Sequence, residues 1–321
     1  MGIAAAAAIP DHAGMQSRRM SRPRVFDYIE AVARARSIRR AAEELNTASS
    51  AVNRMILDYE RELGAPLFER HARGVRLTTA GEYVLAHIRR TAHDEAALRG
   101  QIDGLRGMQR GEVVIAAVEA AGPFLAAGLG AFHMEHRLIC YRVTNAGSAE
   151  VVAAVEREAA EIGLALAPPP SRLVNVLASR RHRLHAFMAD GHPLADRRRL
   201  KLSDCVGFPL ALGDAASGSR RLLDRAFEAL LLDSRPFLTS NAFALMIETT
   251  RHTDAICFQF LPDAADPAPA PDGGLRAVPV EDGRLSPVDL ALIVHARRAL
   301  APAAALLADR LAAGLRDAAT G

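Results

Sequence analysis

The side chains with the clearest chemical potential are short hydrogen-bonding groups and a guanidinium on one side of a predicted helix. Ser49, Ser50, Asn53 and Arg54 stand opposite the apolar stripe of that helix, close to its N-terminus. Hydroxyl, amide and guanidinium groups are the ones that read base edges in the major groove. The alternative is a merely solvated helix face. We favour contact with duplex DNA, because a short helix precedes this helix and a basic hairpin follows it.

Three helices must position these groups. Apolar spacing predicts a first helix over 24–35, and Ser37 is placed to cap the short second helix. Thr47 is a second cap candidate, ahead of a third helix that ends at Gly64. This third helix is expected to bury Val52, Met55, Ile56, Tyr59 and Leu63.

A small basic hairpin is predicted after the third helix. Runs at 67–70 and 75–78 flank a Gly-centred turn, and Arg70, Arg73 and Arg76 can reach phosphates. Three helices followed by such a hairpin indicate a winged helix-turn-helix domain over 24–81. The candidate DNA-contacting residues are Ser37, Thr47, Ser49, Ser50, Asn53, Arg54, Arg70, Arg73 and Arg76.

This segment closely resembles the N-terminal domain of LysR-type transcriptional regulators. The match is carried by Phe26, Val32, Ser37, Ala41-Ala42, Leu45, Ala51-Val52, Arg54, Ile56, Glu60, Leu63-Gly64, Leu67-Phe68-Glu69-Arg70, Arg73-Gly74-Val75, Leu77-Thr78 and Ala80-Gly81. Three departures fall on residues that would read DNA. Ser49, Ser50 and Asn53 stand where the family usually has Gln, Pro and Ser. A known operator sequence is therefore not expected to transfer to this chain.

The distribution of charge supports a DNA partner for the N-terminal part. Between Arg18 and Arg110 there are 18 arginines against 12 acidic residues, a net charge of +6, so the rest of a chain of net charge +3 carries −3. Phosphate neutralisation by such a surface gives salt-dependent binding, to which the helix face adds specificity. The expected partner is double-stranded DNA.

A linker segment at 82–110 is expected to be a long helix that dimerises. Thr79 with Glu82 resembles a capping box, so the helix should begin there and run to about Arg106. Positions on one side of it advance by steps of four and three, the spacing of a coiled-coil seam, although Thr91 and Glu95 make the middle of that seam polar. The alternative is a single helix packed on its own domain, but a dimerising linker helix is what the resemblance implies. The candidate seam residues are Val84, Ile88, Leu98, Ile102 and Leu105.

Strand and helix patterns alternate through 111–321, and the first five elements read as strand-helix-strand-helix-strand, which predicts a parallel sheet. This part resembles the effector-binding domain of the same family, through Glu161-Ile162-Gly163-Leu164 and His192-Pro193-Leu194-Ala195. The resemblance implies a two-lobed, periplasmic-binding-protein-like α/β fold whose cleft holds a small molecule. Lobe I is expected at about 111–179 and 283–321, and lobe II at about 180–282. Glu158 stands where a glycine is usual, so the cleft is expected to be remodelled.

Ligands in such open α/β lobes bind beyond the carboxyl ends of strands, near helix N-termini. Ser148 and Asn241 are the favoured contacts, although each is equally well explained as a helix cap. If Glu119 faces the ligand, it should repel a carboxylate and prefer a cation or a hydroxyl donor. The candidate effector-binding residues are Glu119, Ala120, Gly147, Ser148, Ser217, Ser219 and Asn241.

Other chemistry finds little support in the sequence. Cys140, Cys205 and Cys257 lie singly in apolar surroundings and suit buried small side chains. The pairs His133 with His136 and His182 with His185 lack the further ligands of a metal site, and a solvated face is the expected setting. No catalytic constellation, metal or cofactor is predicted.

We therefore expect a cytoplasmic transcriptional regulator, not an enzyme, that forms a homodimer or tetramer, with RNA polymerase as a further candidate partner. No apolar run reaches the roughly 18 residues that a membrane span requires. Residues 1–23 are expected to be a disordered extension. Two alternatives stay open: an enzyme or solute-binding module with a DNA-binding head, and a ligand-independent repressor with a decayed cleft.

Overall fold

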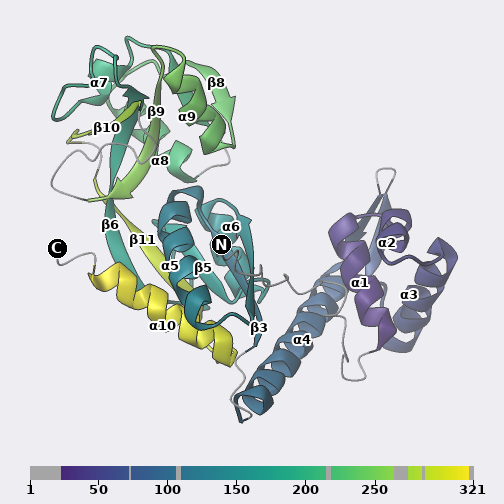
Figure 1. Cartoon of the computed structure of the whole chain (residues 1–321). Helices are drawn as coiled ribbons and strands as arrows, with labels where there is room; N and C mark the ends of the chain where they lie inside the picture. Colours follow the sequence, from purple (N-terminus) through teal and green to yellow (C-terminus); the bar gives the residue numbers. More distant parts are fainter. Residues whose placement is uncertain are drawn as a thin grey trace, which may run out of the picture. The chain divides into compact units, whose positions relative to one another are not determined.

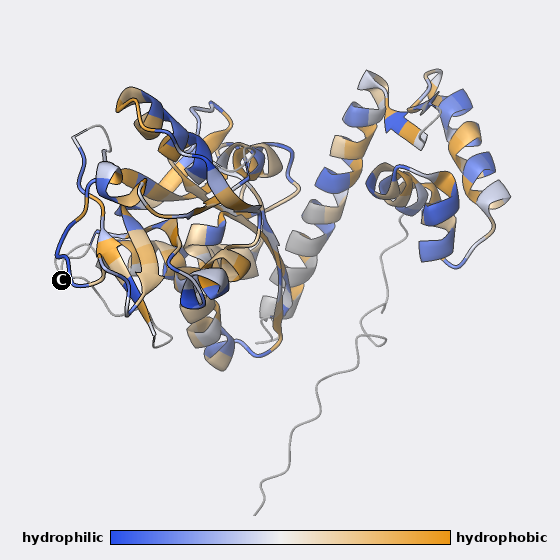
Figure 2. Ribbon diagram, turned by 90° about the horizontal axis from the view of Figure 1, so that it is seen from above, coloured by the Kyte–Doolittle hydropathy of each residue, from blue (hydrophilic) through white to orange (hydrophobic). Residues whose placement is uncertain are grey.

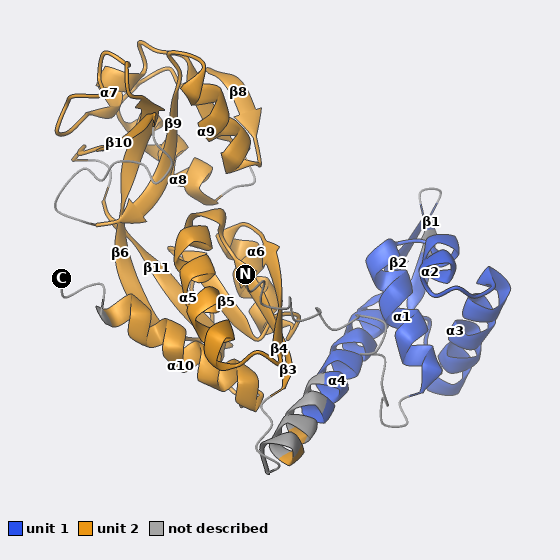
Figure 3. Ribbon diagram, in the orientation of Figure 1, with its two compact units in different colours: residues 1–95 blue, residues 96–321 orange. Residues whose placement is uncertain are grey.

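The computed structural model describes residues 23–71, 74–105, 110–214, 218–263, 274–283 and 286–317. The chain forms two compact units, residues 1–95 and residues 96–321, and their boundary lies inside helix α4, Thr79–Leu105 (Figure 3). The predicted disordered extension lies outside the described residues, apart from Pro23.

The first unit has the predicted winged helix-turn-helix fold. Its elements are α1 (Arg24–Ala35), α2 (Ile38–Glu44), α3 (Ser49–Leu63), β1 (Phe68–His71), β2 (Gly74–Leu77) and the start of α4. The two strands pair antiparallel in the register Phe68 to Leu77. Hydrophobic residues on one side of each helix bury a common core, and the striping is visible in Figure 2. Members of this core include Phe26, Ile29, Val32, Val52, Ile56, Leu67 and Ile88.

The buried stripe of α3 is narrower than the sequence predicted. Val52 and Ile56 are buried, and Tyr59 packs edge-on against Phe26 with ring centroids 6.0 Å apart. Met55 and Leu63, however, are 37% and 45% exposed, so their predicted burial was wrong. A single core behind the helix accommodates only one narrow row of its side chains.

Helix caps were predicted correctly at one of three positions. The Ser37 hydroxyl accepts a hydrogen bond from Arg40 N at 3.4 Å and caps α2, as predicted. The cap assigned to Thr47 was wrong, because the turn continues to Ala48, which is the N-cap of α3. The capping box assigned to Thr79 was also wrong. Thr78 Oγ1 accepts from Gly81 N at 3.0 Å and performs that role one residue earlier.

Gly81 lies at the start of α4, against the backbone of Leu67 and the side chain of Leu77. A Cβ atom there would be 2.2 Å from Leu67 O, a backbone atom that cannot simply move aside. We expect Gly81→Ala to lower the free energy of unfolding by about 1–3 kcal/mol. Gly130→Ala is the matched control, because the added Cβ has nothing within 4 Å and alanine favours a helix by about 1 kcal/mol. Urea unfolding followed by circular dichroism measures both, and a stabilised Gly81→Ala variant would refute the steric argument.

The second unit is built on one nine-stranded sheet in the described part of the chain (Figure 1). The strand order is β4-β3-β5-β11-β6-β9-β7-β8, and β10 pairs with β6. The strands are β3 (Gly111–Ala117), β4 (Ile139–Asn145), β5 (Ile162–Leu166), β6 (Val174–Ala189), β7 (Leu210–Gly213), β8 (Pro236–Ser240), β9 (Ile256–Pro262), β10 (Leu275–Pro279) and β11 (Val288–His295).

The sheet divides into two lobes joined by β6. We call the half with β4, β3, β5 and β11 lobe I, and the half with β9, β7, β8 and β10 lobe II. The N-terminal part of β6 pairs with β11 and its C-terminal part with β9 and β10. The predicted parallel pairing is confirmed for β3, β4 and β5, because each βαβ connection returns the chain in the same direction.

Helices cover both lobes. Lobe I carries α5 (Gly122–Glu135), α6 (Ser148–Glu156) and α10 (Pro302–Asp317), and the 3-10 turn η2 (Glu119–Ala121) precedes α5. Lobe II carries α7 (Leu202–Cys205), α8 (Gly218–Ala229) and α9 (Phe243–Arg251). The main core lies between these helices and the sheet, where Ile115, Ile162, Leu164, Phe227 and Phe260 are at most 1% exposed.

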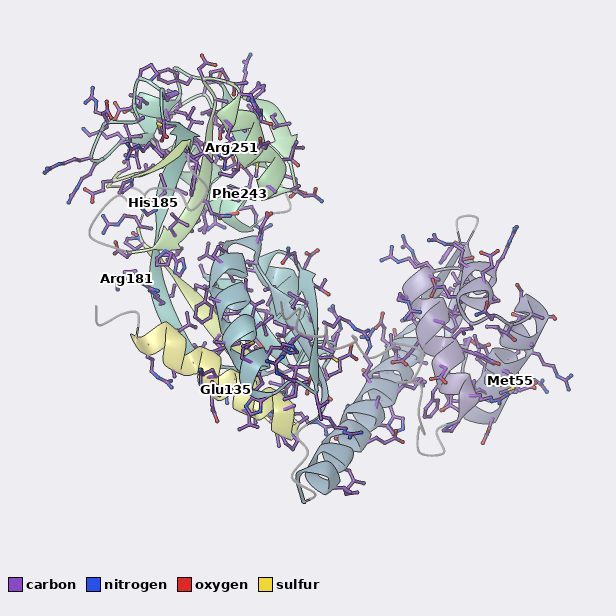
Figure 4. All side chains as sticks on the ribbon, in the orientation of Figure 1. Met55, Glu135, Arg181, His185, Phe243 and Arg251 are labelled. Carbon is purple, nitrogen blue, oxygen red and sulfur yellow. The ribbon has the colours of Figure 1, made fainter. Side chains whose placement is uncertain are left out.

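Strand β6 is the element that the sequence pattern revealed least. Only 184–188 was predicted as strand, whereas β6 runs from Val174 to Ala189. Its first half carries exposed residues, including Val176 at 57% exposure, and therefore lacks a clean apolar alternation. His182 and His185, expected on a solvated face, are 2% and 5% exposed, because β6 is an interior strand that α9 and α10 pack against (His185 is labelled in Figure 4).

Two backbone positions explain how the Glu161-Ile162-Gly163-Leu164 marker is built. A Cβ on Gly163 would lie 2.6 Å from Ile293 Cγ1 and 2.9 Å from Val155 Cγ2, so only glycine lets β5 pack this closely. Glu158, where a glycine is usual, has a φ of 56°. Glu158 therefore adopts the left-handed backbone conformation that a glycine would adopt more easily, because a Cβ atom makes that conformation less favourable.

Candidate DNA interface and effector cavity

The polar face of α3 is open to solvent in the first unit. Ser49, Ser50 and Arg54 are exposed and Asn53 is half-exposed, as the sequence analysis required of a surface that meets a partner. The Arg54 side chain is 84% exposed, and its Nε lies 3.8 Å from Asp58 Oδ2. A surface ion pair of this length is weak, so the guanidinium is free to turn toward another acceptor.

The hairpin is attached to the same helix. The Glu60 carboxylate, on α3, accepts hydrogen bonds from Leu67 N at 2.6 Å and Phe68 N at 3.1 Å. On the other strand, Val75 N donates to Arg36 O at 3.1 Å. The sequence matches the family at Glu60 but does not reveal that this side chain holds the hairpin. That role depends on the C-terminal turn of α3 lying next to the start of β1.

The remaining candidate DNA-contacting residues differ in their exposure to solvent. Arg76 is exposed on β2, Thr47 is half-buried, and the Ser37 hydroxyl is engaged in capping. The Arg70 side chain and the whole of Arg73 lie outside the described residues.

Helix α4 changes its surroundings along its length. Ile88 is fully buried in the core of the first unit, so assigning it to a dimer seam was wrong, and Val84 is half-buried against the same core. Leu98 and Ile102 are 44% and 42% exposed. The Leu105 side chain lies outside the described residues. The exposed apolar positions therefore belong to the C-terminal half of the helix.

A cavity of about 300 Å³ lies between lobes I and II of the second unit. That size is at the lower end of the range for small-molecule sites. Six of the seven predicted effector-binding residues line it, and Ser217 lies outside the described residues. The six are Glu119, Ala120, Gly147, Ser148, Ser219 and Asn241.

Ser148 lines the cavity but is not the helix cap that the sequence left open, because Gly147 is the N-cap of α6. It is the first residue of α6, but its hydroxyl donates to Leu166 O at 2.7 Å, and Ser148 is only 5% exposed. From lobe II, Gly218 comes so close that a Cβ there would lie 3.2 Å from Ser148 Oγ. The start of α8 and the start of α6 therefore meet at this end of the cavity.

Glu119 links the two lobes. Its Oε1 accepts a hydrogen bond from Phe243 N, at the start of α9, at 2.8 Å (Phe243 is labelled in Figure 4). Burial raises the pKa of Glu119, and the hydrogen bond from Phe243 only partly opposes that rise. A carboxylate of lobe I thus occupies the helix N-terminus of lobe II.

We expect Glu119→Gln to stabilise the ligand-free protein at alkaline pH. The glutamine oxygen can still accept from Phe243 N, while the cost of burying a charge disappears. Because the folded-state pKa of Glu119 is raised, the cost is absent where the carboxyl is protonated in both states. It grows as the pH rises past the unfolded-state pKa and is complete above the folded-state pKa. The gain in melting temperature should therefore be present at about pH 8 and vanish near pH 4.

Thermal unfolding of both proteins at the two pH values measures this gain. Glu112→Gln removes an exposed carboxylate that is paired with Arg142 and serves as control, because it relieves no burial. An equal melting temperature of wild type and Glu119→Gln at pH 8 would contradict the assigned cause.

Several cavity residues were missed by the sequence analysis. Asn145, Arg220 and Gln259 line the cavity, and Met246 and Phe258 supply apolar wall. Arg220 could have been noticed, because it follows the predicted Ser217 to Ser219 loop. Gln259 lies within a strand whose pattern reads as buried, so no local signal marks it.

The cysteines and histidines singled out by the sequence form no metal-binding group in the described part of the chain. Cys205 and Cys257 are fully buried, as expected, and burial raises the pKa of the Cys205 thiol to about 12. Burial also lowers the pKa of His182 and His185, which favours their neutral forms. Among the described residues, no group of three His, Cys, Asp or Glu side chains is arranged to hold a metal ion. No described helix combines the length and apolarity needed to cross a membrane.

A winged helix-turn-helix joined through a helix to a two-lobed α/β domain with an interlobe cavity defines a DNA-binding regulator with an effector-binding domain. Family models agree over nearly the whole described chain. The model of the LysR substrate binding domain matches residues 106–316, and that of bacterial regulatory helix-turn-helix proteins of the lysR family matches residues 23–82. The chain belongs to the LysR family of transcriptional regulators, and the prediction that it is not an enzyme is confirmed by that membership.

Named relatives are regulators from bacteria. The RuBisCO operon transcriptional regulator of Allochromatium vinosum is 29% identical over 204 residues, 64% of this chain and 67% of that protein. The HTH-type transcriptional regulator CbbR of Xanthobacter flavus is 27% identical over 282 residues, 86% of this chain and 82% of that protein. The crystal structure of full-length CbnR complexed with its target DNA has the same fold, with a TM-score of 0.61, 19% identity and coverage of 92% of this chain and 99% of that one.

Proposed function

We propose that this regulator binds a two-fold symmetric operator as a homodimer, or as a pair of dimers, and that a small molecule in the interlobe cavity controls it. The observation that carries the proposal is the combination of an exposed polar α3 face with a cavity walled by both lobes. Because it acts on chromosomal DNA, we place it in the cytoplasm, with RNA polymerase as its further partner at the promoter.

The proposed DNA contacts are of two kinds. Ser49, Ser50, Asn53 and Arg54 read base edges from α3, while the arginines of the hairpin, Arg76 among them, bind phosphates. The two hydrogen bonds from the start of β1 to Glu60 support this division, because they fix the hairpin to the reading helix. CbnR, which shares this fold, has been crystallised in complex with its target DNA, and this supports a DNA-binding role for the fold.

The proposed dimer uses the C-terminal half of α4. Leu98 and Ile102 lie there at a spacing of four residues and are 44% and 42% exposed, so two large aliphatic side chains are available to a partner helix. Pairing this helix with its copy across a two-fold axis covers them and gives the operator its symmetry.

Effector control is proposed to act through the relation between the lobes. A ligand in the cavity contacts lobe I at Gly147 and lobe II at Ser219 and Asn241, so it favours one lobe arrangement over another. A cavity of about 300 Å³ favours this view over a decayed cleft, because a cleft without a ligand has no reason to stay open.

Selection from random duplex DNA tests the proposal. Purified full-length protein should enrich a sequence with two related half-sites about one helical turn apart. The enriched site should survive competition by nonspecific DNA. Enrichment of no common sequence, or of a single half-site without a symmetric partner, would overturn the proposed dimeric mode of binding.

A further inference from the structure

No described residue supplies a compensating cation to Glu119 in the cavity wall. Among the described residues, its one interaction is the hydrogen bond that Oε1 accepts from Phe243 N at 2.8 Å. No arginine, lysine or histidine of the described chain forms an ion pair with it. A half-buried carboxylate in this situation is stabilised by any cation that enters the cavity.

The positive charge in the cavity wall is already neutralised. Arg220 Nε donates to Asp224 Oδ1 at 2.6 Å, and Arg220 Nη1 donates to Gly213 O at 2.8 Å. Its side chain is only 14% exposed, so it is held in these bonds by the surrounding protein. A ligand carboxylate would have to compete with Asp224 for this guanidinium.

Helix N-termini, which commonly attract anions, are also occupied at two points of the wall. Glu119 accepts from Phe243 N at the start of α9, and Glu150 Oε2 accepts from Gly147 N at the start of α6, at 3.1 Å. The acidic side chains of the protein thus stand where a ligand's carboxylate would otherwise bind. Asp214 adds a third acidic residue to the wall.

Gln259 offers a donor to the same cavity. It lines the cavity and is 8% exposed, and its Oε1 accepts from Phe260 N at 3.1 Å. Its side-chain nitrogen therefore carries two N–H groups that no other described residue accepts from. The amide nitrogen keeps some solvent contact in the cavity, so it is available to donate to a bound ligand.

We propose that the effector is a small organic cation, an amine that also carries a hydrogen-bond acceptor such as a hydroxyl oxygen. The amine binds the Glu119 carboxylate of lobe I, and the acceptor binds the Gln259 amide of lobe II. The ligand thereby spans the two lobes. This inference rests on the proposed function of the cavity as the effector site.

Titration calorimetry of the full-length protein with matched short-chain compounds tests the inference. The probes are amino alcohols, the hydroxy acids of the same chain length and the corresponding diols. We expect the amino alcohols to bind and the hydroxy acids not to bind. Glu119→Gln should weaken the binding of amino alcohols by about tenfold to a hundredfold, the value of a hydrogen bond to a charged group. Glu112→Gln removes the same charge from an exposed site paired with Arg142 and should leave affinity unchanged.

Three results would overturn the proposed ligand class: binding of hydroxy acids in preference to amino alcohols, binding of amino alcohols that Glu119→Gln does not weaken, or binding of none of the probes. The proposed regulatory function is judged separately, by operator binding without any probe. If the hydroxy acids bind and change operator affinity, the effector site stands and only the cation is wrong. If no operator is found, the regulatory proposal fails whichever compound binds.

Discussion

Ile102→Asp is expected to dissociate the dimer and to lower operator affinity by about 10²–10⁴-fold. Ile102 is 42% exposed on the C-terminal half of α4, and a charge in the proposed seam would have to be buried without a partner. The loss in DNA affinity follows from lost bivalency, because a monomer has only one reading helix for two half-sites. Sedimentation velocity and operator titration on the same sample measure both effects.

The control for this variant is Leu306→Asp, which places the same charge at an aliphatic residue of α10 that is 38% exposed. It should leave the dimer and the operator affinity intact. If Ile102→Asp also remains dimeric, the seam does not lie on this part of α4. If it becomes monomeric yet binds the operator with full affinity, the bivalent mode of binding is wrong.

Arg54→Ala should weaken binding to the specific operator by about tenfold to a hundredfold while leaving the dimer and the unfolding transition intact. A guanidinium that contacts a base edge is worth about 1–3 kcal/mol of discrimination. The side chain is 84% exposed and takes part in no core packing, so its removal costs the fold little. Binding to nonspecific duplex should change much less than binding to the operator.

Arg61→Ala tests whether operator affinity depends on the position of the arginine along α3 or only on its positive charge. Arg61 lies on the same helix, is 77% exposed and pairs with Asp58, but it stands two turns closer to the C-terminus of α3. Operator affinity should change by less than about threefold in this variant, the range of a surface charge. Equal losses for Arg54→Ala and Arg61→Ala would reduce the role of Arg54 to general charge attraction.

Local patterns predicted the DNA-binding unit well because its helices are amphipathic and short. The spacing of apolar residues gave α1 its observed bounds, and the Gly-centred turn gave the hairpin. Caps were harder to place, since Thr47, Thr78 and Thr79 are all suitable residue types. The backbone conformation determines which of these threonines caps a helix, and that conformation cannot be read from the residue pattern.

The error on α4 has a physical origin. Val84, Ile88, Leu98 and Ile102 follow one apolar spacing, but the first two cover the core of the DNA-binding unit and the last two are exposed. A coiled-coil spacing indicates only that one side of the helix is buried. The spacing does not indicate whether that side packs against the same chain or against a second copy of the chain.

The effector cavity was partly predictable for a topological reason. Residues that follow the carboxyl ends of parallel strands must gather at one edge, and Glu119, Gly147 and Asn241 do line the cavity. The contact of Glu119 with Phe243 was not predictable, because it joins residues 124 positions apart in the sequence across two lobes. Gln259 escaped notice for a similar reason, since only the assembled sheet brings β9 to the cavity.

The most direct test of the regulatory role is a nuclease footprint of the full-length protein on the DNA upstream of its own gene, at two salt concentrations and with nonspecific competitor. We expect protection of a two-fold symmetric site that survives the competitor, with affinity that falls as salt rises. Diffuse protection that the competitor or the higher salt abolishes at every site would contradict sequence-specific regulation by this chain.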